Sequence, residues 1–204
     1  MKSLLALIWP LVLATGINAQ DNATSPQRAA IRTPEGAHFI WNQPNNNFTL
    51  DIRGKDVRPN NRTDDVYFKA DDIVLQIQTS AISQFISGPK ANRPDQHTIL
   101  TLHRDWEAQH AETILGRLTI LDTTETKLSN GRVTLLWRFN IPKGFEQYGK
   151  ASIFLTTVNE DSVIVLAANT KSDLDEARVR QFLIDTMGTL KVSDKPFELP
   201  TRQR

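Results

Sequence analysis

One stretch of the chain groups three side chains that can ligate a metal ion: His103, Glu107 and His110. On a helix the three would fall within about 60° of one another. Two imidazoles and a carboxylate suit zinc or non-haem iron. The two histidines would, however, be separated by about 10.5 Å along the helix axis. Each ligand atom lies about 2 Å from a shared ion. Only the adjacent pairs, His103 with Glu107 or Glu107 with His110, can therefore easily bind the same ion.

The alternative to a metal site is a structural role for the same residues. In this interpretation both histidines flank Trp106 at the edge of the core, and Glu107 hydrogen-bonds one of them. Matches confined to one helix often arise by chance. We therefore expect no cofactor, and zinc bound by His103, Glu107 and His110 is the alternative.

A glycine-bounded loop presents two aromatic side chains. Residues 142–150 place Phe145 and Tyr148 between Gly144 and Gly149. Exposed loop aromatics bury a large area on binding and often anchor a partner protein. The alternative is that both rings pack back onto the edge of a sheet as a small satellite cluster. The sequence thus predicts a partner-binding site at Phe145 and Tyr148.

Signatures of covalent or nucleotide chemistry are missing from the sequence. It has no cysteine, no G-x-S-x-G elbow and no Gly-rich phosphate loop. Paired carboxylates occur in turn-like sequence, where capping explains them better than glycoside hydrolysis does: Asp64-Asp65, Asp71-Asp72 and Asp175-Glu176. We predict no catalytic residue, and a hydrolase of unrecognised type is the last alternative.

The N-terminus has the pattern of a secretory signal peptide over residues 1–19. Lys2 precedes an apolar run that is too short to span a bilayer. Small residues allow cleavage after Gly16 or Ala19. An exported chain without cysteine is expected in a bacterial periplasm or outside the cell, more readily than in a eukaryotic secretory route. The glycosylation triplets at Asn22, Asn47 and Asn61 arise often by chance.

Removal of Lys2 with the signal peptide leaves 23 basic residues of the original 24, against 23 acidic ones. The mature chain is therefore formally neutral. Neutrality gives no reason to expect nucleic acid or an anionic membrane as partner. We expect no transmembrane segment in the mature chain, and a protein partner in the cell envelope.

The first half of the chain is predicted to contain strands followed by one long helix. Residues 20–34 lack periodicity and are expected to form a flexible arm, and residues 54–65 a loop. The strand candidates are residues 38–41, 48–52, 66–70 and 73–79. The helix is predicted over residues 95–115, with Asp95 as N-cap and Gly116 as C-terminal cap. Its predicted buried stripe consists of Ile99, Leu102, Trp106, His110 and Ile114.

The second half is predicted to be an antiparallel meander closed by a helix. Asn130-Gly131 indicates a tight hairpin between strands at 118–128 and 133–141. Residues 153–158 and 163–168 form a second hairpin, and the latter strand is apolar on both faces, as in the centre of a sheet. The closing helix starts at a capping box, Asp173 with Glu176. Its apolar face comprises Val179, Phe182, Leu183, Met187 and Leu190.

This order of elements over residues 66–192, with the Asn130-Gly131 hairpin and the closing helix, resembles the PsbP-like family. The resemblance implies an α+β fold, an α/β/α sandwich in which a long central helix and a C-terminal helix pack on an antiparallel sheet. We expect one domain over residues 35–192 and a flexible tail over 193–204.

The resemblance also implies a binding or accessory protein, since members with this fold are mostly of that kind and many are exported. Our first hypothesis is therefore an exported, non-enzymatic domain that binds a partner protein or an envelope complex. The alternative is a protein that binds a small ligand or a metal on the helix face around His103, Glu107 and His110.

Overall fold

The computed structural model describes residues 26–60, 66–172 and 175–200. The predicted signal peptide over residues 1–19 and the triplets at Asn22 and Asn61 lie outside these ranges. Asn47 is buried, and its side-chain amide donates to the carbonyl of Ser193 at 3.3 Å. The amide nitrogen that a glycan would modify is therefore engaged inside the fold.

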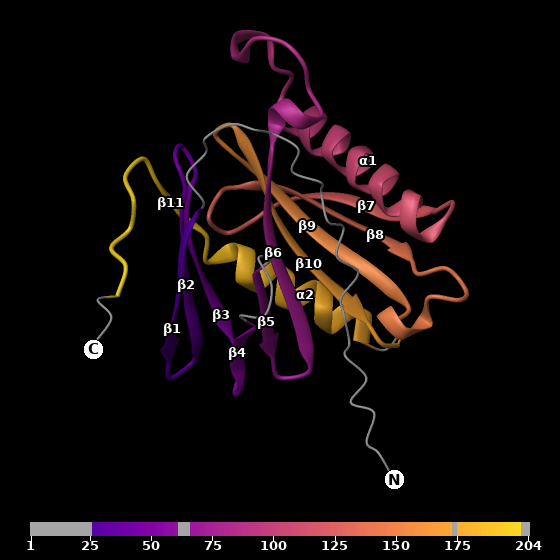
Figure 1. Cartoon of the computed structure of the whole chain (residues 1–204), viewed down its shortest axis with the longest axis horizontal. Helices are drawn as coiled ribbons and strands as arrows, with labels where there is room; N and C mark the ends of the chain where they lie inside the picture. The colour runs from indigo at the N-terminus through magenta and orange to yellow at the C-terminus, as the bar shows by residue number, and fades with distance from the viewer. Residues whose placement is uncertain (1–25, 61–65, 173–174, 201–204) are drawn as a thin grey trace.

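The described residues form two antiparallel sheets and two long helices (Figure 1). The small sheet has the order β1-β2-β3-β11, and the large sheet has the order β4-β5-β6-β10-β9-β8-β7. The small-sheet strands are β1 (Gln27–Thr33), β2 (Gly36–Asn42), β3 (Asn47–Arg53) and β11 (Lys191–Ser193). The large-sheet strands are β4 (Val57–Asn60), β5 (Val66–Ala70), β6 (Ile73–Ala81), β7 (Ile120–Lys127), β8 (Val133–Asn140), β9 (Ala151–Asn159) and β10 (Ser162–Thr170). The helices are α1 (Gln96–Leu115) and α2 (Glu176–Gly188), and the short 3₁₀ turns are η1 (Ile82–Gln84), η2 (Lys90–Asn92) and η3 (Glu146–Tyr148).

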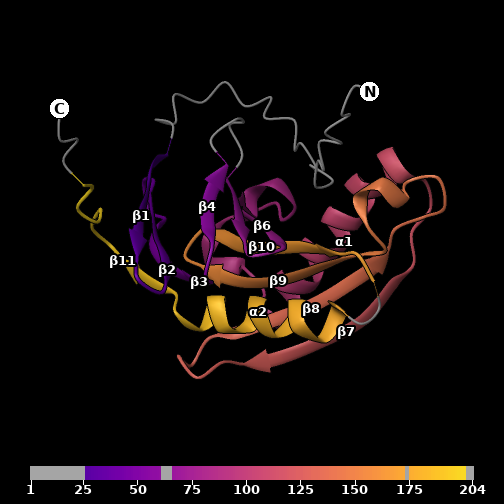
Figure 2. The same cartoon turned by 90° about the horizontal axis from the view of Figure 1, so that it is seen from below.

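The large sheet is covered on both faces, by α1 on one and by α2 on the other (Figure 2). Side chains along a strand alternate between the faces. In β10, for example, Val163 and Val165 pack in the cluster under α1, whereas Ile164 and Leu166 pack in the cluster with α2. β10 is the middle strand of the sheet, as its two-sided apolar sequence predicts.

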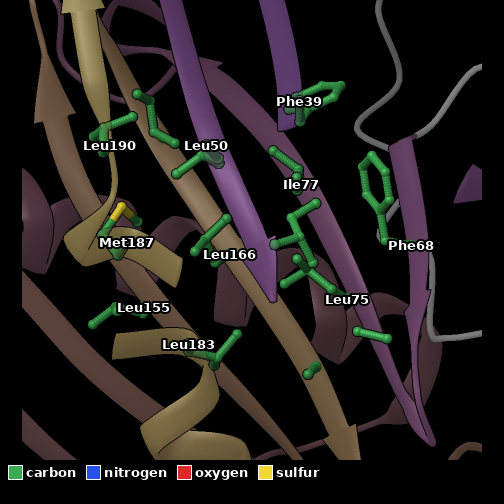
Figure 3. Close-up of a cluster of buried hydrophobic side chains, with 14 of the residues drawn as sticks. Phe39, Leu50, Phe68, Leu75, Ile77, Leu155, Leu166, Leu183, Met187 and Leu190 are labelled. Carbon is green, nitrogen blue, oxygen red and sulfur yellow. The ribbon is translucent and has the colours of Figure 1, made fainter. Parts of the chain in front are cut away.

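The small sheet packs on the same core cluster as α2. Phe39 and Leu50 from the small sheet meet Leu75 and Leu166 from the large sheet and Leu183 from α2 (Figure 3). All five side chains are at most 2% exposed. The α+β class, with a long helix and a C-terminal helix on opposite faces of an antiparallel sheet, is therefore confirmed. No helix in the described ranges is long and apolar enough to cross a membrane.

The prediction of a flexible arm over residues 20–34 is wrong for residues 27–33, which form β1. This strand pairs with β2 along its whole length, from Gln27 against Asn42 to Thr33 against Gly36. Most of its side chains are exposed. A strand whose two faces meet water lacks the alternation of apolar and polar residues by which strands are predicted. The sequence of β1 therefore carries no strand signal.

The predicted loop over residues 54–65 likewise contains a short strand, β4. It lies at one edge of the large sheet, where Pro59 is tolerated because an edge residue need not donate to a neighbour.

The predicted flexible tail over residues 193–204 is wrong for part of its length, which is held against the small sheet. β11 pairs with β3, and the backbone N–H and carbonyl of Phe197 bond the side chain of Asn42 at 2.9 and 2.7 Å.

The predicted buried stripe of α1 is wrong in part. The helix begins after Asp95, whose carboxylate accepts from Thr98 N at 2.8 Å, and it ends at Gly116 as expected. Leu102 and Ile114, however, are 40% and 48% exposed. The buried residues of the helix are Ile99, Leu100, His103, Glu107, Ala108, Ala111 and Leu115.

The reason for this rotation lies in the sheet below α1. Trp137 and Phe154 stack there with ring centroids 4.1 Å apart, and Phe139 adjoins them. These rings fill the layer, so the helix presents a face that carries the small side chains of Ala108 and Ala111. The same face brings His103 and Glu107 inside.

Two local predictions differ in their turn chemistry. At the β7–β8 hairpin only Gly131 has positive φ, at 81°, and Leu128 N donates to Arg132 O at 2.9 Å. This is a three-residue loop rather than the two-residue turn that Asn-Gly favours. In the predicted capping box, Asp173 lies outside the described residues, and α2 begins after Asp175 without a side-chain cap.

Candidate functional site

The loop that joins β8 to β9 is tied to the sheet at its base. Ile141 N donates to Lys150 O at 2.8 Å, and Lys150 N donates to Thr170 O at 2.7 Å. Gly149 has φ of 121°, and a Cβ at this position would overlap the carbonyl oxygen of Thr170. The loop therefore lies directly against the end of β10, and this close approach requires glycine.

Phe145 and Tyr148 are partly buried and stack on each other, with centroids 6.3 Å apart and ring planes at 22°. Both rings pack against the core cluster under α1. The alternative prediction, that they pack back onto the sheet, therefore describes the sides of the rings that face the core. Their role as partner anchors stays a prediction. What the structure adds is that Tyr148 also lines a pocket.

The pocket has a volume of about 260 Å³ and lies between the loop and the adjacent strands β6 and β10. Val74 and Asn169, on the face of the sheet that carries α1, line it from below, and Tyr148 and Gly149 line its side. Asn169 is fixed at both ends of its amide: Ser152 Oγ donates to Oδ1 at 2.8 Å, and Nδ2 donates to Tyr148 O at 2.9 Å. The remaining lining residues are Asp72, Glu146, Gln147 and Lys171.

Two carboxylates at the pocket are held in the ionised state. The side chain of Arg178 hydrogen-bonds Asp72 and lowers the pKa of that carboxyl, and the charge of Lys171 acts in the same direction. Backbone N–H groups of Glu146 itself and of Gly144 lower the pKa of the Glu146 carboxyl. Carboxylates with lowered pKa are weak proton acceptors near neutral pH.

The predicted metal ligands are only partly brought together. His103 and Glu107 have side chains with no exposed area, and His103 Nε2 lies 3.4 Å from Glu107 Oε1. Gln78 Nε2 on β6 donates to the same oxygen at 3.3 Å. His110 is directed elsewhere: its Nδ1 lies 3.0 Å from Trp106 O.

Within residues 26–60, 66–172 and 175–200, no group of three or more His, Cys, Asp or Glu side chains is arranged to hold a metal ion. Both ring nitrogens of His103 and Oε2 of Glu107 lack a hydrogen-bond partner among these residues. The structural interpretation is wrong about the hydrogen bond: Glu107 faces His103 at 3.4 Å, but its Oε1 accepts from Gln78 instead. It is also wrong about the place of His103, which lies inside the core and not at its edge.

Sequence reasoning missed the pocket residues that come from outside the aromatic loop. Asp72 follows Asp71, which has φ of 54° in the turn between β5 and β6 and accepts from Asp56 N at 3.0 Å. The predicted turn role of this carboxylate pair was therefore right for Asp71. Asp72, Asn169 and Lys171 had no spacing signal, because strand pairing brings them together over almost 100 positions of sequence.

No protein-family model matches the chain, and no curated protein sequence does. Among solved structures, the chain is similar to the solution structure of cyanobacterial PsbP (CyanoP) from Synechocystis sp. PCC 6803. The two are 12% identical, with a TM-score of 0.45, over 88% of this chain and 99% of that one. A PsbP protein is thus among the solved structures to which the chain is similar, as the order of elements in the sequence predicts.

Proposed function

We propose that this chain is an exported, non-catalytic binding domain that engages a partner protein in the cell envelope, in the periplasm or outside the cell. Its binding surface is the loop 142–150 together with the pocket beside it. The observation that carries the proposal is the pocket of about 260 Å³ between Tyr148 and the ends of β6 and β10.

The size and lining of the pocket favour a protein partner. Sites for small molecules usually enclose about 300–1,000 Å³, and this pocket is smaller. It suits one side chain inserted from a partner. An aromatic wall at Tyr148, with polar groups of Asn169 and Lys171 close by, is the type of environment in which single anchor residues contribute most of the binding energy.

The ionisation of the pocket favours binding over catalysis. A general acid or base works best with a pKa near the operating pH. Asp72 and Glu146 are shifted in the opposite direction, by Arg178 and by backbone N–H groups respectively. The pair His103 and Glu107 has no exposed side-chain area and does not line the pocket, so it has no route to a substrate there.

The test is a pull-down from the native envelope fraction with tagged mature protein, followed by mass spectrometry. Tyr148→Ala removes the aromatic wall, and Lys171→Glu reverses a charge at the pocket. Lys191→Glu makes the same charge change at an exposed position on the small sheet and is the matched control. One stoichiometric partner that is retained by the control and lost from both pocket variants would support the proposal.

Two results would contradict it. The first is recovery of the same partner in equal amount with all variants, which would place the interface elsewhere. A blank with every protein, together with stoichiometric zinc retained through chelator-free purification, would favour the metal-binding alternative instead. A His110→Ala variant that keeps this zinc would exclude the predicted three-ligand set.

A further inference from the structure

β7 forms an exposed outer edge of the large sheet. It pairs with β8 and with no other strand in the described ranges. Every side chain from Asp122 to Lys127 is exposed. β7 therefore leaves one side of its backbone available for hydrogen bonding.

The hairpin fixes which residues of β7 direct their backbone outward. Leu128 N donates to Arg132 O at 2.9 Å, so these two residues form a hydrogen-bonded pair. Hydrogen-bonded and non-hydrogen-bonded pairs alternate along an antiparallel ladder. Counting back from Leu128, Thr126 bonds β8, whereas Glu125 and Lys127 direct N–H and C=O away from the sheet.

The opposite edge of the same sheet, formed by β4, is poorly suited to pair with a further strand. β4 has only four residues, and Pro59 within it has no N–H to donate. β7 has eight residues and no proline. A shift of register between Leu121 and Thr124 divides its pairing with β8 into residues 120–121 and residues 124–127.

A groove lies between α1 and residues 117–120, which lead into β7. The helix runs alongside the strand in Figure 1 and reaches it through side chains. His97 Nδ1 lies 2.6 Å from Glu125 Oε2, and Glu112 Oε1 accepts from Leu118 N at 2.9 Å. Between these contacts an open groove of about 460 Å³ remains. Five of its eight lining residues are polar or charged, among them Asp105, Glu112 and Arg117, and the other three are Ala108, Leu118 and Ile120.

We propose that β7 and this groove bind an extended segment of another protein, which adds to the large sheet as a further strand. The backbone groups of Glu125 and Lys127 specify an extended partner backbone. The groove, where Leu118 and Ile120 lie beside charged residues of α1 and of the following segment, receives one side chain of that partner beyond the register shift. β7, Ile120–Lys127, corresponds to about 26 Å of strand at 3.3 Å per residue, the length of a segment of about eight residues.

This inference goes beyond the function proposed above and does not rest on it, because the two surfaces have no residue in common. It involves strand addition, in which main-chain hydrogen bonds supply affinity and alternate side chains supply specificity. The pocket beside Tyr148 instead receives one side chain. Variants of each surface therefore separate the two proposals.

The experiment uses a displayed library of random peptides of about 12 residues, selected against the mature chain. A selected peptide is then titrated against variants. Glu125→Pro removes an outward N–H at an edge position that tolerates proline. Glu125→Ala loses the same contact with His97 but keeps the N–H, and is the matched control.

We expect selected peptides to bind in an extended conformation, and to shift backbone amide resonances of β7 and of residues 117–120. Glu125→Pro should weaken binding by about tenfold or more, whereas Glu125→Ala should stay within about twofold, because main-chain hydrogen bonds supply the affinity. Tyr148→Ala should leave peptide binding unchanged. Lys127→Pro with Lys127→Ala repeats the comparison if Glu125→Pro fails to fold.

Three results would overturn the proposal. The first is the absence of any enriched peptide. The second is binding that is equal in the proline and alanine variants, which would exclude strand addition. The third is a concentration-dependent dimer in analytical ultracentrifugation that Glu125→Pro abolishes, which would assign the edge to a second copy of this chain.

Discussion

A histidine and a glutamate, His103 and Glu107, share the buried face of α1 one turn apart. Oε1 of the glutamate accepts from Gln78, but Oε2 and both imidazole nitrogens have no hydrogen-bond partner among the described residues. Buried polar groups in native proteins are usually hydrogen-bonded. A buried pair of opposite potential charge adds little net stability, whereas loss of one member leaves the other uncompensated.

We predict a strong non-additivity between these two residues. His103→Leu alone leaves a buried carboxylate and should lower the free energy of unfolding by about 3 kcal/mol. The double variant His103→Leu/Glu107→Leu should be close to the parent chain or more stable. Urea unfolding of the parent, both single variants and the double variant measures the coupling. Additive losses would show that the pair makes no mutual interaction.

Gly149 is the residue on which the position of the aromatic loop depends. Its φ is 121° and it lies against the Thr170 carbonyl, whereas Gly144 has φ of 96° with open space around its Cβ position. Positive φ alone costs a side chain about 1–2 kcal/mol. We predict that Gly149→Ala destabilises the chain more than Gly144→Ala does, because the first also displaces the loop from β10. Thermal melts of the two variants compare them, and equal losses would contradict a steric role for Thr170.

At the scale of the element, the apolar residues of α1 do not identify the face that the helix buries. The apolar residues Leu102 and Ile114 lie outside, and the polar pair lies inside. α2 is simpler, because its predicted apolar residues Val179, Leu183 and Met187 are buried, together with Thr186. The difference arises from the sheet below each helix. Beneath α1, stacked rings fill the layer and select small side chains above them.

The corrected face of α1 can be tested by two leucines that are two positions apart. Leu100 is fully buried and Leu102 is 40% exposed. We predict that Leu100→Ala lowers the free energy of unfolding by about 2–5 kcal/mol, whereas Leu102→Ala changes it by less than about 0.5 kcal/mol. Denaturant titration of the two variants decides between the faces. A larger loss of unfolding free energy for Leu102→Ala than for Leu100→Ala would show that the buried face is the one that the sequence pattern predicts.

At the scale of the whole molecule, ion pairs link segments that are distant in the chain. Asp72 after β5 pairs with Arg178 on α2, and Asp161 between β9 and β10 pairs with Arg93 near η2 at 2.6 Å. The hydrogen bond from Arg178 is the main cause of the lowered pKa of Asp72. For Asp161, side-chain bonds from Lys90 and Arg93 lower the pKa.

These shifts fix the direction of the pH dependence. A carboxyl whose pKa is lowered by folding contributes stability that is fully present above its unfolded pKa, about 3.9 for Asp. That contribution is lost as the pH falls through the lower pKa of the folded state. We predict a melting temperature that declines as the pH is lowered from about 5 to about 2.5. Asp72→Asn should make this decline shallower. An unchanged decline would show that the ion pair of Asp72 with Arg178 does not contribute to the pH dependence of the melting temperature.

Much of this fold follows from local pattern. The alternation in residues 133–141, the two-sided apolar strand at 163–168 and the face of the closing helix each specify one element and the side that it buries. Hydrophobic periodicity is a property of neighbouring residues, so it can be read without knowing what lies opposite. The aromatic loop and its bounding glycines are visible for the same reason.

Only the tertiary structure decided the rest. The pocket unites Asp72, Tyr148 and Asn169 through strand pairing, and no local spacing encodes that pairing. The rotation of α1 depends on the rings beneath it, and β1 depends on a partner strand because its own side chains meet water. The sequence by itself determined which segments are regular and which faces are apolar, because these are short-range properties. Which segments become neighbours, and so which polar groups share a site, is settled by long-range packing.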